Sequence, residues 1–246
     1  MTPTADPPPR PALPQGGEVW CHWLRLDLPE EEWERLGEFL SPEELARAGR
    51  FQFPGGRRRF VAARGQLRAA LGRCLGIPPA AVAITTEDRG KPVLAPESAP
   101  SGLHFNLSHS GDAALLAITR AGPVGADLEQ VRPLAEMDGL VTRFFSAGEQ
   151  SAFARLAAAE KPPAFFRLWT RKEAWLKATG VGITRGLDQV EVTFQPDAPA
   201  RLLGLPVGAG DPRDWTLNEP CAPEGFLAAV AVRHPYAQLL SAPDRR

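Results

Sequence analysis

The spacing of apolar residues predicts alternating helices and strands along the chain. Apolar residues recur at helical spacing from Arg57 to Leu75, which predicts a helix. An unbroken apolar run over residues 113–119 is suited to a buried strand, and residues 124–131 predict a second strand. We expect these two strands to pair as a hairpin across the turn at residues 120–123.

Local start and stop signals define further elements. Ser41-Pro42-Glu43-Glu44 and Ser146-Ala147-Gly148-Glu149 both predict capping boxes at helix N-termini, the second helix running to about Ala159. Pro162-Pro163 predicts the start of another helix, which ends at Gly180. Further strands are expected over residues 19–28, 81–85, 190–194 and 226–232. This order indicates an α+β fold with helices and strands in both parts of the chain and a seam near residues 120–122.

Composition narrows the class of protein. The 246 residues are 43% hydrophobic and 23% charged, which is typical of a globular protein, and the net charge of −1 argues against nucleic-acid binding by overall charge. Cys21, Cys74 and Cys221 have neither zinc-ligand nor disulfide spacing, so we expect free thiols in a reducing cytoplasm. No apolar run approaches the roughly 18 residues that span a bilayer. The first 17 residues hold six prolines and predict a disordered leader.

The basic residues are distributed unevenly in type and position. Only four are lysine and 24 are arginine, and asparagine occurs twice, a bias that we attribute to GC-rich coding sequence. The positions that keep Lys or Asn are therefore informative. Residues 47–73 hold eight arginines and no acidic residue, which favours a localised anionic ligand. The alternative is a solvated helix face. Within this block, Arg64 and Arg68 form an i, i+4 column at the border of the apolar face, which could either reach a phosphate or extend along the apolar surface into solvent.

The helix predicted after Pro163 carries charged residues within its apolar face. Lys172 and Glu173 fall inside the apolar arc, and Lys177 lies at its edge. Inward charges are costly unless they are paired or bind a ligand or metal ion. A Glu173–Lys177 ion pair would explain two of them and leave Lys172 unmatched, so a functional role is favoured. The opposite, solvent side of this helix is expected to hold Arg167, Arg171, Ala174 and Ala178.

Two further segments carry candidate chemistry. Asp127 and Glu129 alternate along a predicted strand and so share one face, where two carboxylates could hold Mg²⁺. The alternative is an exposed strand edge. Residues 104–111, just before the buried strand, read as a phosphate-binding loop with Ser108 and His109. A nucleophile–base pair is a weaker alternative there, because no G-x-S-x-G motif is present. The chain also lacks Walker A and Rossmann motifs.

Taken in order, five segments resemble the Sfp-type 4′-phosphopantetheinyl transferases, and the resemblance spans about residues 57–182. The paired G-x-D-x-E and W-T/S-x-K-E-A-x-x-K motifs carry most of its specificity. The segments are Gly90-Lys91-Pro92, Phe105-Asn106-Leu107-Ser108-His109-Ser110, Gly125-Ala126-Asp127-Leu128-Glu129, Arg143-Phe144-Phe145-Ser146 and Trp169-Thr170-Arg171-Lys172-Glu173-Ala174-Trp175-Leu176-Lys177.

This resemblance implies two similar α+β halves in one chain, with the active site at their interface. We expect a leader over residues 1–17, halves over 18–121 and 122–240, and a tail over 241–246. The implied activity is Mg²⁺-dependent transfer of 4′-phosphopantetheine from coenzyme A to a serine of an apo acyl or peptidyl carrier protein, releasing adenosine 3′,5′-bisphosphate. A monomer without nucleic-acid or membrane partners is expected. The alternative is a non-catalytic module that binds coenzyme A or a carrier protein.

The resemblance also implies roles for individual residues. Asp127, Glu129 and Glu173 would bind the metal. Arg68, Ser108 and His109 would hold the 3′-phosphate region, and Lys91 would contact the nucleotide. Lys177 would face the pyrophosphate, where it and Lys172 are candidates to stabilise the leaving phosphate. Glu173 could instead be the base for the attacking serine, so the expected catalytic residues are Glu173, Lys177 and Asp127.

Overall fold

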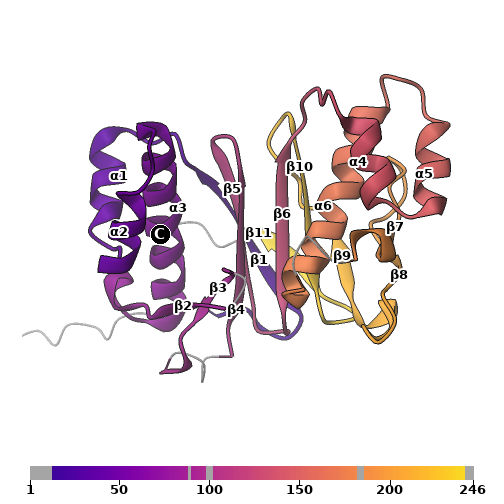
Figure 1. The fold of residues 1–246 in the computed structure, drawn as a ribbon. Coiled ribbons are helices and arrows are strands. Elements are labelled where there is room, and N and C mark those ends of the chain that lie inside the picture. The colour runs from indigo at the N-terminus through magenta and orange to yellow at the C-terminus, as the bar shows by residue number, and fades with distance from the viewer. Residues whose placement is uncertain (1–12, 88–89, 98–101, 182–185, 242–246) are drawn as a thin grey trace, which may run out of the picture.

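The computed structural model describes residues 13–87, 90–97, 102–181 and 186–241. Helices form the two outer layers, and two β-sheets lie between them (Figure 1). The two sheets share an apolar core, in which Val19 and Leu115 of one sheet lie in the same cluster as Ala126 and Val230 of the other. The α+β prediction with a two-half organisation is therefore confirmed.

The first sheet has the strand order β11-β1-β5-β4. Strands β1 (Glu18–Arg25) and β4 (His104–Ser110) flank β5 (Ala113–Thr119) in antiparallel pairing, and β11 (Gln238–Ser241) pairs with β1 in parallel. The segment expected to be a phosphate-binding loop is therefore the regular strand β4. The predicted pairing of residues 113–119 with 124–131 is wrong, because both edges of β5 are occupied by β1 and β4.

The second sheet has the order β6-β10-β9. Strand β6 (Val124–Gln130) pairs antiparallel with β10 (Phe226–Val232), which also pairs with β9 (Thr216–Asn218). The chain crosses between the sheets at residues 120–123, where Gly122 has φ 145° and a Cβ would lie 3.0 Å from the carbonyl oxygen of Arg233. The seam predicted there thus separates two sheets. The C-terminal strand β11 returns to the first.

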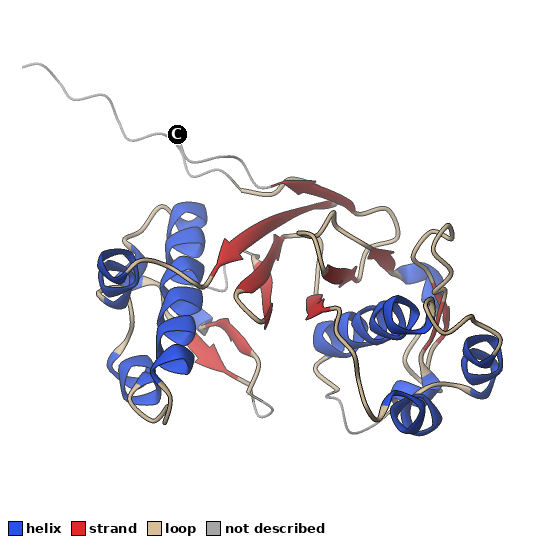
Figure 2. Cartoon of the chain, turned by 90° about the horizontal axis from the view of Figure 1, so that it is seen from above, coloured by secondary structure: helices blue, strands red, loops and turns tan. Residues whose placement is uncertain are grey.

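The helices lie on the outer side of each sheet (Figure 2). Helices α1 (Glu30–Gly37), α2 (Pro42–Ala48) and α3 (Pro54–Leu75) lie on the first sheet's side, and α4 (Met137–Phe144), α5 (Ala147–Ala154) and α6 (Lys161–Thr179) on the second's. Helices α3 and α6 are the ones that pack against the strands. The short elements are η1 (Pro79–Ala81), β2 (Ile84–Thr86), β3 (Pro92–Leu94), η3 (Leu187–Gln189), β7 (Glu191–Val192), β8 (Leu202–Gly204) and η4 (Pro212–Asp214).

Both predicted capping boxes are present. The Ser41 hydroxyl accepts from the Glu44 amide, and Ser146 does the same with Glu149. Of the predicted leader, residues 1–12 lie outside the described residues, whereas Leu13 packs against the core. Of the predicted tail, residues 242–246 also lie outside them, and Ser241 belongs to β11.

Helix α6 is buried on nearly all sides, so the predicted solvent face is wrong. It packs so closely on β6 that a Cβ at Gly125 would lie 2.1 Å from the carbonyl oxygen of Ala174. Small side chains at Ala174 and Ala178 permit this approach, and both are buried. Arg171 is also fully buried and pairs with Glu219 at 3.0 Å. This second packing face was predicted to face solvent because two of its four residues are arginine.

Strands β4 and β6 belong to different sheets but run side by side, and side chains of β4 bind the free edge of β6. Every second backbone amide of β6 donates to a side-chain oxygen of β4. These bonds stand in place of the backbone hydrogen bonds that a neighbouring strand would make. The three bonds run from Ala126 N to Asn106 Oδ1 (2.8 Å), from Leu128 N to Ser108 Oγ (3.2 Å) and from Gln130 N to Ser110 Oγ (3.1 Å).

Candidate active site

Three segments bring Lys177, Asp127 and Ser108 together where the two sheets meet. Lys177 Nζ lies 2.5 Å from Asp127 Oδ1 and 3.0 Å from Ser108 Oγ. The Ser108 hydroxyl lies 3.1 Å from the same carboxylate oxygen. Asp127 is buried, whereas the Lys177 side chain is 30% exposed. Helix α6, strand β6 and strand β4 thus combine in one polar cluster that is open to solvent at the lysine.

The two other predicted carboxylates lie beside this cluster. Glu173, one helical turn before Lys177, is 2% exposed, and burial together with the nearby Asp127 raises the pKa of this carboxyl to about 7. Glu129 follows Asp127 by two residues on β6, and its Oε2 accepts from the Ser110 hydroxyl at 2.9 Å. Ser108 and Ser110 therefore each bind one of the two β6 carboxylates.

The donor set fits a divalent cation in its chemistry. Within the described ranges, Asp127 Oδ2 and Glu173 Oε1 are buried and have no hydrogen-bond partner. Buried carboxylate oxygens without partners are unusual, and such oxygens are the ligands that Mg²⁺ prefers. No group of three or more His, Cys, Asp or Glu side chains in the described part of the chain is arranged to hold a metal ion. The metal role of Asp127, Glu129 and Glu173 therefore stays a prediction.

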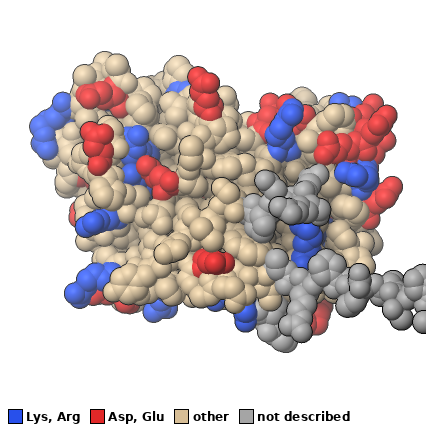
Figure 3. Space-filling view, turned by 180° about the vertical axis from the view of Figure 1, so that it is seen from behind, with Lys and Arg blue, Asp and Glu red and all other residues tan. Residues whose placement is uncertain are grey.

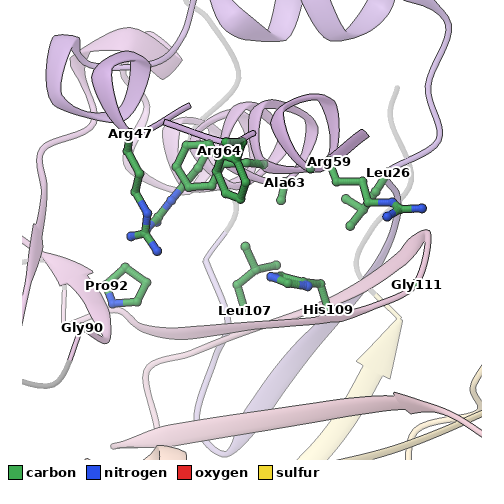
Figure 4. A pocket seen from close by; sticks show the side chains of 13 residues that line it. Leu26, Arg47, Arg59, Ala63, Arg64, Gly90, Pro92, Leu107, His109 and Gly111 are labelled. Carbon is green, nitrogen blue, oxygen red and sulfur yellow. The ribbon is translucent and has the colours of Figure 1, made fainter. Parts of the chain in front are cut away.

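A cavity of about 480 Å³ lies between α3 and β4. Arg47 and Arg64 point into it from the helices, and Leu107 and His109 of β4 face them from the other side (Figure 4). Arg64 Nη1 is buried and, within the described residues, unpartnered. The cavity walls and the nearby Lys177 lower the pKa of His109, which keeps this side chain neutral near pH 7. The cavity is thus suited to an anionic ligand.

Of the arginines of this cavity, Arg64 was singled out from the sequence together with Arg68, whereas Arg47 and Arg59 were recognised only as members of the basic block. The run of eight arginines without an acidic residue was the available signal. Arg59 also lines the cavity and pairs with Asp112 at 2.6 Å. The structure does not bring Arg68 there: this side chain is 3% exposed, lies 2.7 Å from Glu44 and donates to the Val82 carbonyl at 2.9 Å. Arg68 thus joins α3 to α2 and to the segment before β2.

Lys172 lies in the interior of the second half. Its ammonium lies 2.5 Å from Glu149, donates to the Leu187 carbonyl at 2.7 Å and sits over the ring of Phe145. The side chain is fully buried, and burial lowers its pKa. The structure therefore does not bring Lys172 to the Lys177–Asp127 cluster. Its partner Glu149 also belongs to the capping box of α5. The sequence predicted this capping role of Glu149 and not its ion pair with Lys172.

Lys91 reaches from the turn before β3 to the second half. Its ammonium donates to the carbonyl of Lys177 at 2.6 Å and to that of Val124 at 3.2 Å. Burial lowers the pKa of this lysine. It also lines a second cavity of about 320 Å³, whose walls include Glu173 and Lys177.

Comparisons with known proteins identify relatives over nearly the whole chain. Residues 123–231 match the family model described as the 4′-phosphopantetheinyl transferase superfamily, and residues 28–121 match that of the 4′-phosphopantetheinyl transferase N-terminal region. The chain is 44% identical over 215 residues to the 4′-phosphopantetheinyl transferase HetI of Nostoc sp., covering 87% of each protein. It is 30% identical over 224 residues to 4′-phosphopantetheinyl transferase Sfp of Bacillus subtilis, covering 89% of this chain and 93% of that protein.

None of the helices in the described ranges combines the length and the apolar character needed to cross a bilayer.

Proposed function

The chain belongs to the 4′-phosphopantetheinyl transferase superfamily and catalyses phosphopantetheinyl transfer from coenzyme A to carrier proteins, and we propose that this transfer takes place at the Lys177–Asp127–Ser108 cluster. The alternative of a non-catalytic binding module is not favoured. The carrier that is modified, the monomeric state and the cytoplasmic location stay predictions. Three arginines of the basic block, Arg47, Arg59 and Arg64, line a cavity of suitable size for a small anionic ligand.

The first step of the proposal is the placement of coenzyme A. The 480 Å³ cavity supplies Arg47, Arg64 and His109 for the phosphates of the nucleotide end. This cavity and the 320 Å³ cavity share Pro92 and Leu107, so they adjoin. Because Lys177 lines the second cavity, a coenzyme A bound across both would carry its diphosphate past the cluster.

The second step is the metal ion. Asp127, Glu129 and Glu173 would hold Mg²⁺, using the two buried oxygens that lack partners. When bound, the ion supplies positive charge that neutralises the diphosphate. The ammonium of Lys177 is then available to the leaving phosphate rather than to Asp127 alone, and a compact cation with three donors suits that role.

The third step is displacement at phosphorus. The hydroxyl oxygen of the carrier serine attacks the phosphorus that bears the pantetheine. The bond from that phosphorus to the bridging oxygen breaks, and adenosine 3′,5′-bisphosphate leaves. We assign the serine proton to the carboxylate of Glu173, because this residue and Lys177 line the same cavity. Glu173 would serve as metal ligand as well as base.

The observation that carries this proposal is the convergence of a lysine and buried carboxylates beside an arginine-lined cavity. Its test is incubation with coenzyme A, Mg²⁺ and a panel of apo carriers of the fatty-acid, polyketide and non-ribosomal-peptide types, followed by mass spectrometry of each carrier. The expected result is addition of one phosphopantetheine to at least one carrier. Tight coenzyme A binding with no mass change on any carrier would support the binding-module alternative instead.

A further inference from the structure

The free edge of β6 is bound by side chains of the first half at every second residue from Val124 to Gln130. The carbonyl of Val124 accepts from Lys91, and the amide of Ala126 donates to Asn106. Two of the four links, those of Ser108 and Ser110, also contact the carboxylates of the candidate site. The hydrogen bonds of the other two, Lys91 and Asn106, go to backbone atoms of the second half. The role of these two side chains therefore differs from that of the two serines.

Lys91 binds the end of the helix that carries Lys177. The last carbonyls of a helix have no partner within the helix, and a cation is favoured at this negative end of the helix dipole. Lys91 Nζ lies 2.6 Å from the carbonyl oxygen of Lys177 and 3.2 Å from that of Val124. One ammonium thus fixes α6 and β6 to each other and to the first half. The residue whose backbone it binds is the one whose side chain reaches Asp127.

Asn106 acts on the other member of that pair. Its Oδ1 accepts from the amide of Ala126 at 2.8 Å, and the side chain is 4% exposed. Ala126 directly precedes Asp127, so this bond fixes the strand beside the carboxylate. Asn106 also lines the 320 Å³ cavity, so this bond fixes β6 directly at the cavity wall. Lys91 therefore fixes the backbone of Lys177, and Asn106 fixes the backbone next to Asp127.

We propose that Lys91 and Asn106 are positioning residues, which set the register of α6 and β6 against the first half so that Lys177, Asp127 and Ser108 meet. This inference rests on the proposed function of that cluster. It assigns to Lys91 a role different from the nucleotide contact that the sequence predicted. A displacement of about 1 Å at a reacting centre can lower a rate by about a hundredfold, so loss of either residue should affect turnover more than binding.

The test compares Lys91→Met with the matched control Lys161→Met, because Lys161 is a partly exposed residue that lies 3.9 Å from Asp138 and outside the proposed site. For Lys91→Met we expect kcat for carrier modification to fall about tenfold, with the Kd for coenzyme A from calorimetry unchanged within about twofold. Lys91→Arg, which keeps two or more donors, should recover part of kcat. A Kd that rises about tenfold with kcat unchanged would establish the nucleotide contact and overturn the proposal, as would unchanged kcat and Kd.

Hydrogen exchange gives a second readout that does not depend on turnover. In Lys91→Met, amides in the last turn of α6 and the first half of β6 should exchange several-fold faster than in Lys161→Met, while those of α3 keep their rates. Asn106→Ala should accelerate exchange around Ala126 and lower kcat in the same way. Unchanged exchange in both variants would contradict the positioning role. If the unsubstituted protein modifies no carrier, the proposed function fails, whereas the exchange rates still report whether Lys91 and Asn106 fix α6 and β6.

Discussion

A Cβ atom at residue 125 would lie 2.1 Å from the carbonyl oxygen of Ala174, so only glycine allows β6 to approach α6 this closely. The contact lies two residues from Asp127 on the strand and three from Lys177 on the helix. It therefore sets the distance at which the lysine meets the carboxylate.

Replacing this glycine should separate the strand from the helix. We expect Gly125→Ala to lower the free energy of unfolding by about 3 kcal/mol, since the new methyl group meets backbone atoms that cannot rotate away. Urea denaturation measures the change. The control is Gly139→Ala, because no atom lies within 4 Å of a Cβ at that exposed helical position, and it should stabilise the chain by about 0.5–1 kcal/mol. Equal stability of the two variants would contradict the close contact.

The buried carboxyl of Glu173 should make stability depend on pH. Its pKa is raised from 4.5 to about 7 in the folded chain, so folding favours the protonated form. The stabilisation is complete below about pH 4.5 and is lost as the pH rises through 7, with a total of about 3 kcal/mol. In metal-free buffer, the free energy of unfolding of the unsubstituted protein should therefore fall between pH 4.5 and 8 when compared with that of Glu173→Gln at each pH. Parallel pH profiles of the two proteins would refute the raised pKa, and the exposed Glu224→Gln serves as control.

The ion pair of Lys172 with Glu149 should be essential to stability and irrelevant to ligand affinity. We expect Lys172→Met to cost about 3–5 kcal/mol, because the buried carboxylate would remain without its cation. Adding Glu149→Gln should recover part of the loss, since it removes the unpaired charge. The recovery is partial because the Ser146 and Val192 amides donate to different carboxylate oxygens, and the one amide oxygen of glutamine can replace only one of them. Thermal unfolding and calorimetric titration with coenzyme A are the measurements. A lower affinity in the folded single variant would show instead that Lys172 meets the ligand.

Two neighbouring arginines of α3 should differ in the property that they control. Both arginines pair with Glu44, Arg64 at 3.8 Å and Arg68 at 2.7 Å. Arg64 also lines the cavity, where its buried Nη1 has no partner among the described residues, whereas Arg68 donates to backbone carbonyls. We expect Arg64→Met to weaken coenzyme A binding about tenfold or more with little loss of stability. Arg68→Met should lower stability by about 3 kcal/mol while the folded fraction keeps its affinity. The reverse pattern would place the phosphates beside Arg68, as the sequence suggested.

Motif spacing predicted the polar cluster better than it predicted the surrounding contacts. Asp127 was singled out by alternation along a strand, Lys177 by its place at the edge of an apolar helix face, and Ser108 by the composition of its segment, and all three are local signals. The pairing of Lys177 with Asp127 rather than with Glu173 depends on how closely β6 packs on α6. That distance is a tertiary property, encoded by Gly125 and Ala174, which lie far apart in the chain.

The structural roles of Arg68, Lys172 and Lys91 were hidden for a related reason. Each side chain is a cation in a motif that suggests an anionic ligand, but each finds acceptors within the protein, on elements distant in sequence. Likewise, the segment containing Ser108 has the composition of a phosphate loop, and only its pairing with β5 makes it a strand. Composition predicts the charge that a segment carries, whereas the partner of that charge depends on the fold.

The central claim, that Asp127 and Lys177 form the transfer site, is tested most directly by Asp127→Asn. The measurement is the rate of carrier modification, by mass spectrometry, at saturating coenzyme A and Mg²⁺ in a protein whose folding is verified by circular dichroism. A fall of at least about a hundredfold relative to the unsubstituted protein is expected, because the substitution removes the charge that pairs with Lys177 and would bind the metal. A rate within about threefold of the unsubstituted protein would contradict the account.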